Sequence, residues 1–180
     1  MCFDEWGPLE LKPLGGRTWA LQRRPHRMRA TYNRLQGIEY FLGFYDVHAD
    51  GLSGRFVERQ RVVELAAAFR QLRTCSPRRR LYVVLDNLPH VHDHPRFLAL
   101  LRRLRIHPVF TPTNASWLNL IEAQFGVLKR FTLTDTDDPT HLVRRRRVAR
   151  YIRYRNHQVG QHHHLLTTML TIRDIKLETH

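Results

Sequence analysis

Three carboxylates occupy positions where solubility alone would not place them. Asp4 closely follows the apolar pair CF, Asp86 ends the apolar run LYVVLD, and Glu122 flanks an apolar stripe within residues 111–130. An ionised carboxylate in such a position is costly unless a positive group neutralises it. Two or three carboxylates suit Mg²⁺ or Mn²⁺, which bridge to phosphate oxygens and can activate a nucleophile for attack on a phosphodiester. These acids predict metal-dependent phosphodiester chemistry.

Each of these acids also has an ordinary structural interpretation. An aspartate after a strand often forms a turn or caps a helix, and a glutamate on the flank of a helix can pair with a neighbouring arginine. Three such acids in one strongly basic chain favour the metal site. The basic surface would hold a polyanion, and the acids would hold the metal that acts on it.

The charge balance indicates the partner. The chain of 180 residues has 30 Lys and Arg against 16 Asp and Glu, a formal net charge of +14. A field of this sign concentrates polyanions, of which nucleic acid is the commonest large one in a cell. No segment approaches the roughly eighteen uninterrupted apolar residues of a membrane span, and Cys2 and Cys75 form no disulfide framework. We expect a soluble intracellular protein with no membrane partner.

Hydrophobic periodicity predicts the elements that position the acids. Asp4 ends or nearly ends a first strand, and a hairpin follows around the turn ADG at residues 49–51. The predicted strands of the hairpin and of the later chain are 38–48, 52–59, 81–86 and 106–110, and the predicted helices are 60–75, 95–105 and 141–157. The continuous apolar run at 81–86 favours a strand covered on both faces. This order predicts an α/β fold with a mixed sheet flanked by helices, in which ligand sites gather at strand ends.

The segment TPTNASWLNLIEAQFGVLKR, residues 111–130, predicts a further helix, capped at Asn114 or Ser116. Its apolar stripe comprises Leu118, Ile121, Phe125 and Leu128. At about 100° per residue, Glu122 points roughly 40° from Leu118. We therefore expect Glu122 on the inner flank of this helix, and Trp117 in the core.

Three segments carry a resemblance to a known family. FDE at 3–5, VVLDN at 83–87 and FTPTNASWLNLIEAQFGVLKR at 110–130 resemble the three catalytic blocks of DDE transposases, in particular the bacterial insertion-sequence enzymes related to the mariner superfamily. The spacing from Asp86 to Glu122 is close to that of this group. The similarity extends from about residue 2 to about residue 158.

The resemblance implies a ribonuclease-H-like fold and a DDE catalytic domain over 1–160, with a basic loop insertion at about 7–37, a C-terminal tail at 161–180 and no N-terminal helix-turn-helix region. Asp4, Asp86 and Glu122 would be the catalytic residues and the ligands of two Mg²⁺ ions, with Mn²⁺ possible. Asn87 would orient Asp86 or cap the turn. The implied activity is metal-dependent cleavage of double-stranded DNA and strand transfer during DNA transposition, by a homodimer in the bacterial cytoplasm.

Basic residues at four places are predicted to contact DNA. The densest run is RRRR at 144–147, on a helix whose buried side would comprise Val148, Tyr151 and Ile152. We expect such binding to weaken steeply with salt. The predicted contacts are Arg17, Arg23, Arg24, Lys129, Arg130, Arg144, Arg145 and Arg147.

Two other functions stay open. A catalytically inactive transposase remnant would bind DNA or a full-length transposase without cutting. A ribonuclease H would need an acid on the first helix, for which Glu64 is the candidate. The histidines at 90, 92 and 94 favour a loop and helix start over a metal site, and no role is assigned to those at 162–164.

Overall fold

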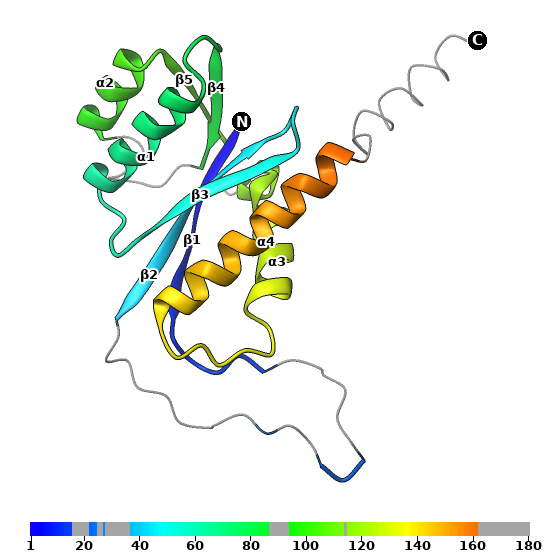
Figure 1. The fold of residues 1–180 in the computed structure, drawn as a ribbon. Helices are drawn as coiled ribbons and strands as arrows, with labels where there is room; N and C mark the ends of the chain where they lie inside the picture. The colour runs from blue at the N-terminus through cyan, green and yellow to red at the C-terminus, as the bar shows by residue number, and fades with distance from the viewer. Residues whose placement is uncertain (16–21, 25–26, 28–36, 87–93, 114, 162–180) are drawn as a thin grey trace.

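The computed structural model describes residues 1–15, 22–24, 27, 37–86, 94–113 and 115–161 (Figure 1). Five strands form one sheet in the order β3-β2-β1-β4-β5. The strands are β1 Cys2–Glu10, β2 Ile38–Asp46, β3 Gly51–Val57, β4 Leu81–Leu85 and β5 Ile106–Phe110. β1, β2 and β3 are antiparallel, whereas β4 and β5 run parallel to β1. The predicted mixed sheet is confirmed.

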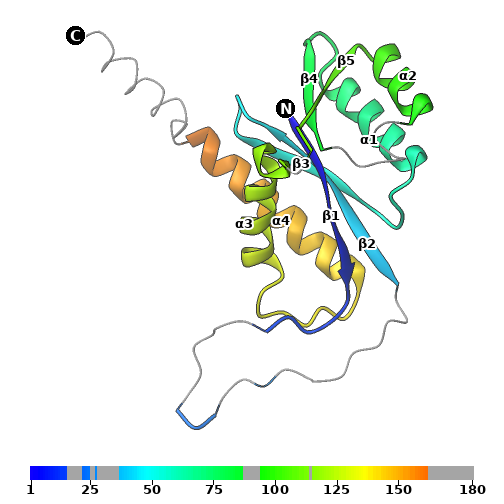
Figure 2. The same cartoon turned by 180° about the vertical axis from the view of Figure 1, so that it is seen from behind.

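The helices lie on both faces of the sheet (Figures 1 and 2). They are α1 Val62–Cys75, α2 Pro95–Arg103, α3 Ile121–Thr132 and α4 His141–Gln161, with a short 3₁₀ helix η2 at Ser116–Leu118. One core packs α1 and α2 against side chains such as Phe3, Leu42 and Val83. The other packs α3 and α4 against Phe41 and Tyr45 on the opposite face. The expected helices near 60–75, 95–105 and 141–157 are confirmed.

β1 is longer than predicted. It pairs with β2 from Cys2 to Glu10, with an irregularity between Trp6 and Leu9, so Asp4 lies within the strand opposite Gly43. The expectation that Asp4 ends or nearly ends the strand is wrong, because the antiparallel ladder with β2 carries the chain through Gly and Pro. Residues 7–10 accordingly belong to β1 and not to the basic insertion predicted at about 7–37.

β4 is fully covered on one face only, since on its other face Val84 is partly buried against the second core. Tyr82 remains 54% exposed, while Leu81, Val83 and Leu85 are buried against α1 and α2. The expectation of cover on both faces is wrong, because α3 contacts β1 and β2 and α4 contacts β3. No helix in the described part of the chain is long and apolar enough to cross a membrane.

Candidate active site

The register of two parallel strands sets Asp4 beside Asp86. Cys2 of β1 pairs with Val84 of β4, and the N–H of Val84 donates to the carbonyl of Met1 at 2.8 Å. Asp4 and Asp86 each lie two residues further along. In a parallel pair the same register carries Asp4 of β1 and Asp86, the residue just after β4, to the same level across the two strands. Two of the three predicted acids therefore come together from distant parts of the sequence.

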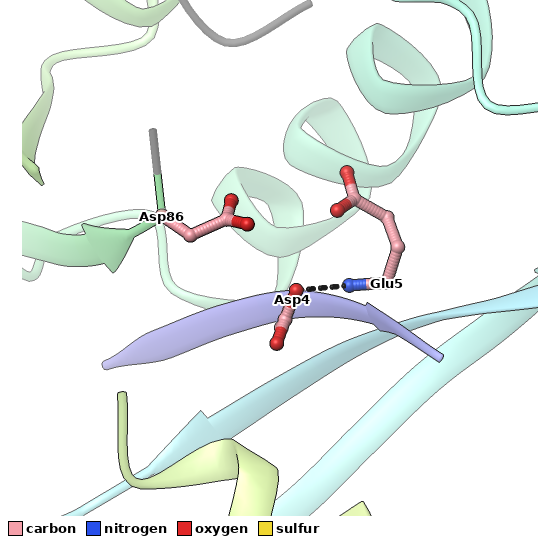
Figure 3. A group of neighbouring side chains, drawn as sticks. All are labelled: Asp4, Glu5 and Asp86. Atoms are coloured by element: carbon pink, nitrogen blue, oxygen red, sulfur yellow. Dashed lines mark hydrogen bonds between the residues drawn. The ribbon is translucent and has the colours of Figure 1, made fainter. Parts of the chain in front are cut away.

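Glu5 joins these two aspartates. Carboxylate oxygens of Asp4, Glu5 and Asp86 lie within 4.8 Å of one another. Figure 3 shows the side chains of Glu5 and Asp86 extending toward each other, while the N–H of Glu5 donates to Oδ1 of Asp4 at 2.8 Å. Glu5 was not among the predicted site residues. Its only signal was its place in the FDE block, and strand alternation gives no reason to expect it beside Asp4.

The environment of Asp4 disfavours its charge. Burial raises the pKa of Asp4 to about 7, the hydrogen bond from Glu5 opposes this shift, and repulsion from Asp86, Glu5 and Glu122 adds to it. Repulsion among neighbouring acids is relieved by a proton or by a cation. A compact group of carboxylate oxygens is the donor set that Mg²⁺ and Mn²⁺ prefer.

Glu122 lies in the first turn of α3, and its side chain is exposed. Among the described residues, the compact acidic group does not include it. The predicted inner flank is wrong because α3 begins only at Ile121. Leu118 belongs to the separate turn η2 and is 45% exposed, so no continuous helical rotation relates it to Glu122. Glu122 still lies within electrostatic range of Asp4, since its charge contributes to the raised pKa of Asp4.

Two contacts hold the start of α3 over β1. Asn119, which is 1% exposed, donates from Nδ2 to the carbonyl of Phe3 at 2.8 Å and accepts the N–H of Glu122 at its own carbonyl at 3.0 Å. Gly43, the partner of Asp4 on β2, leaves room for this approach. A Cβ there would lie 2.7 Å from the Phe125 ring. These contacts bring Glu122 toward the aspartates.

A family model described as DDE superfamily endonuclease matches residues 1–137. The chain belongs to the DDE superfamily endonucleases. The ribonuclease-H-like fold implied by the resemblance is confirmed as well. The bacterial insertion-sequence branch stays a prediction.

Solved structures of Mos1 transposase share the fold of this DDE domain. The paired-end complex with left transposon end superposes with a TM-score of 0.63 at 14% identity, over 84% of this chain and 46% of that chain. The Mos1 mariner paired-end complex with Mn gives 0.62 at 13% identity, over 89% of this chain and 52% of that chain. This chain thus spans about half the length of those proteins. No curated protein sequence matches it.

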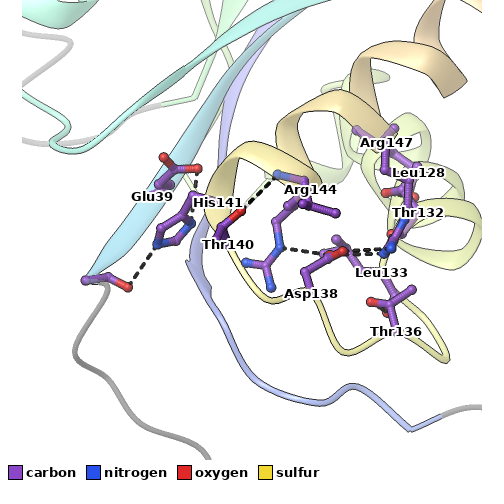
Figure 4. A network of polar contacts seen from close by, with 12 residues as sticks. Glu39, Leu128, Thr132, Leu133, Thr136, Asp138, Thr140, His141, Arg144 and Arg147 are labelled. Carbon is purple, nitrogen blue, oxygen red and sulfur yellow. Dashed lines mark hydrogen bonds and ion pairs between the residues drawn. The ribbon is translucent and has the colours of Figure 1, made fainter.

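The DDE domain does not present all of its predicted DNA contacts to solvent. Arg144 is 1% exposed, with Nε 3.7 Å from Oδ2 of Asp138, so the prediction that it contacts DNA is wrong (Figure 4). Arg147 is bonded to the same carboxylate and to the carbonyl of Thr132, and Arg145 is bonded to Glu39. Four consecutive arginines point in four directions around a helix. Arg144 points inward, whereas the side chain of Arg145 is still 43% exposed beside Glu39.

The exposed arginines of α4 form a different set. Arg146, Arg150 and Arg153 are exposed and line a hollow of about 450 Å³ together with Arg147. Their spacing of four and three residues places them on one side of the helix. This spacing is visible in the sequence, but the prediction was based on the consecutive arginines at 144–147 and overlooked it. The predicted contacts Arg23, Arg24, Lys129 and Arg130 are exposed.

Several predicted residues have other outcomes. Glu64, the acid that a ribonuclease H would need, is bonded to Arg61. The prediction of a buried Trp117 is wrong, since it is 72% exposed in η2. His94 caps the N-terminus of α2, where its Nδ1 accepts the N–H of Arg96 at 3.2 Å, which confirms the predicted helix start. Residues that lie outside the described part of the chain are Arg17, Asn87, His90, His92, and the histidines at 162–164.

Proposed function

We propose that this chain is the catalytic domain of a transposase, which cleaves double-stranded DNA and transfers the cut strand during DNA transposition. The observation that carries this proposal is the parallel register of β1 and β4, with Asp4 beside Asp86. Membership of the DDE superfamily endonucleases supports it. The Mos1 structures of similar fold are paired-end complexes, which supports DNA as the partner, and we expect a homodimer as the active form.

Asp4, Asp86 and Glu122 would hold two Mg²⁺ ions, which Mn²⁺ could replace. One Mos1 complex of similar fold contains Mn. Divalent ions held there would supply activation of the attacking oxygen and stabilisation of the leaving oxygen of a phosphodiester. Asp4 would release its proton as it becomes a ligand, because a nearby cation favours the charged form of a carboxyl group. Glu122, on the exposed turn of α3, would complete the site from the solvent side, where DNA arrives.

Nicking of supercoiled plasmid in Mg²⁺ tests the proposal. Asp86→Asn removes a charge from the acidic group and keeps the shape of the side chain. Mutation of a residue that only supports a metal ligand typically costs roughly 10–100-fold in activity. Because Asp86 would be a ligand itself, we expect Asp86→Asn to reduce the nicking rate by about 100-fold or more. Glu58→Gln is the matched control, because it removes one exposed acid from the end of the hairpin. Equal nicking by wild type and Asp86→Asn would reject the assigned site.

An inactive remnant is the second candidate, and the position of Glu122 outside the compact acidic group favours it. Such a protein would bind DNA in a salt-sensitive way without turnover. Absence of nicking by wild type in both Mg²⁺ and Mn²⁺, with DNA binding retained, would select this function over the enzyme.

A further inference from the structure

A pocket rich in arginine lies at the end of the sheet opposite the carboxylates. It opens between the turn from α1 to β4 and the turn from α2 to β5, which lie side by side in both views (Figures 1 and 2). Its volume is about 500 Å³. The arginines that line it are Arg73, Arg78, Arg79, Arg80, Arg102 and Arg105.

Arg73 fixes the walls of this pocket. Its Nε donates to the carbonyl of Leu104 at 2.7 Å and its Nη2 to that of Arg105 at 2.8 Å. Its Nη1 donates to the carbonyls of Ser76 and Arg79 at 2.8 and 2.9 Å. One guanidinium is therefore hydrogen-bonded to the backbone of both turns. These bonds hold in place the backbone from which the surrounding arginines project.

Most of the remaining charge in the pocket has no acidic counterpart. Arg79 pairs with Asp46 at 3.2 Å. Within the described ranges of the chain, no ion pair involves the exposed side chains of Arg78, Arg80, Arg102 or Arg105. Like charges gathered on two braced turns attract an anion. Guanidinium groups match phosphate oxygens in a two-pronged geometry.

The pocket is separate from the acidic group. β4 begins beside the pocket at Leu81 and leads to Asp86 at its other end. Five residues of strand at about 3.3 Å each separate the two by roughly 17 Å. This is about five base pairs of duplex at 3.4 Å per step. A phosphate bound in the pocket therefore cannot be the one that reacts.

We propose that this arginine pocket binds the phosphate backbone of duplex DNA at a distance from the catalytic carboxylates. The inference rests on the proposed function for its choice of polyanion, and it adds a binding surface on the α1 and α2 side of the sheet. Phosphate contacts of this kind position DNA without reading its sequence.

Binding of a fluorescent 20-base-pair duplex in metal-free buffer, measured by anisotropy over a salt series, tests the pocket. The variant Arg78→Gln, Arg80→Gln, Arg102→Gln is compared with Arg55→Gln, Arg59→Gln, Arg70→Gln, which removes the same charge from exposed positions outside the pocket. Each lost phosphate contact lowers the salt slope by about one, so we expect a drop of about three and at least about tenfold weaker binding for the pocket variant alone. Unchanged thermal unfolding verifies folding.

Three outcomes separate the possibilities. Equal weakening in the two triple variants would overturn the proposal, because only net charge would matter. Displacement of the duplex by tripolyphosphate at equal concentration would reassign the pocket to small phosphates and also overturn it. Selective loss of binding in the pocket variant would support it even if Asp86→Asn nicks plasmid like wild type, because binding is measured without metal. Selective loss of binding together with unchanged nicking by Asp86→Asn would reject the proposed function and leave the proposed DNA-binding pocket standing.

Discussion

Asp4 places a carboxylate within the sheet, where burial and three neighbouring acids make its ionisation costly. The residue is a poor choice for stability and a good one for holding a cation. Its pKa of about 7 means that, without metal, the folded protein retains a proton that the unfolded chain releases near pH 4. The folded state therefore binds more protons than the unfolded state between those two pH values.

The pKa of Asp4 predicts a stability that depends on pH. Where the folded state binds more protons, stability falls as pH rises, so the contribution of Asp4 is lost from about pH 4 to about pH 7. Asp4→Asn should therefore raise the midpoint of thermal unfolding of the metal-free protein at pH 8, and this gain should shrink toward pH 4. Scanning calorimetry at several pH values measures it. A gain independent of pH would contradict the raised pKa.

Glu5 and Glu122 are the two candidates for the third carboxylate. If Glu122 is the third ligand, Glu122→Gln should reduce the rate of metal-dependent nicking by about 100-fold or more. This loss should exceed the roughly 10–100-fold that follows from mutation of a residue that only supports a ligand. Glu5→Gln should then reduce the nicking rate by only about 10–100-fold. Nicking rates across a Mg²⁺ titration compare the two. The reverse order would assign the site to the three acids that already lie together.

At the scale of elements, the close approach of α3 to the sheet depends on Gly43. A methyl group there would meet the Phe125 ring at 2.7 Å and Ile121 at 3.0 Å. The ring is itself stacked on Trp6, with centroids 5.9 Å apart, so it has little freedom to move. The absence of a side chain at Gly43 thereby allows the helix that carries Glu122 to pack closely on β2.

Gly43→Ala should destabilise the fold by about 1–3 kcal/mol, the usual cost of overpacking a core. It should also reduce nicking, because α3 must move away from Asp4. Gly126→Ala is the matched control on the same helix, where an added Cβ meets nothing within 4 Å. There we expect a gain of up to about 1 kcal/mol from helix propensity. Urea unfolding of both variants measures the difference, and equal stabilities would contradict the close packing.

At the scale of the whole molecule, two buried acids fasten the start of α4 to the segment just before it and to β2 (Figure 4). Asp138 lies just before α4 in the sequence and forms ion pairs with Arg144 and Arg147. Glu39, at the start of β2, binds His141 and Arg145. The basic run on α4 thus serves two purposes, since its inward arginines hold the fold and its outward arginines face solvent.

Adjacent arginines should separate these two purposes. Arg144→Ala breaks a buried pair and should cost about 3–5 kcal/mol, whereas Arg146→Ala should change stability by no more than about 0.5 kcal/mol, as at other exposed sites. Arg146→Ala should instead weaken DNA binding and lower its salt slope by about one. Urea unfolding and fluorescence anisotropy measure the two effects. Similar stability losses in both variants would contradict the burial of Arg144.

The order and type of the elements could be predicted from the sequence, because helix and strand periodicity are local properties of the chain. The hairpin around residues 49–51, the helix α1 and the final helix follow from spacing alone. The presence of one acid within an apolar strand, Asp4, and of another just after an apolar strand, Asp86, is also visible without any knowledge of packing.

Tertiary structure decided which of these residues meet. The pairing of Cys2 with Val84 sets the two aspartates side by side and recruits Glu5. The late start of α3 leaves Glu122 exposed, and the buried Asp138 holds Arg144 inside the protein. Strand register and helix placement are set by contacts between segments far apart in the chain, and local patterns carry no information about them.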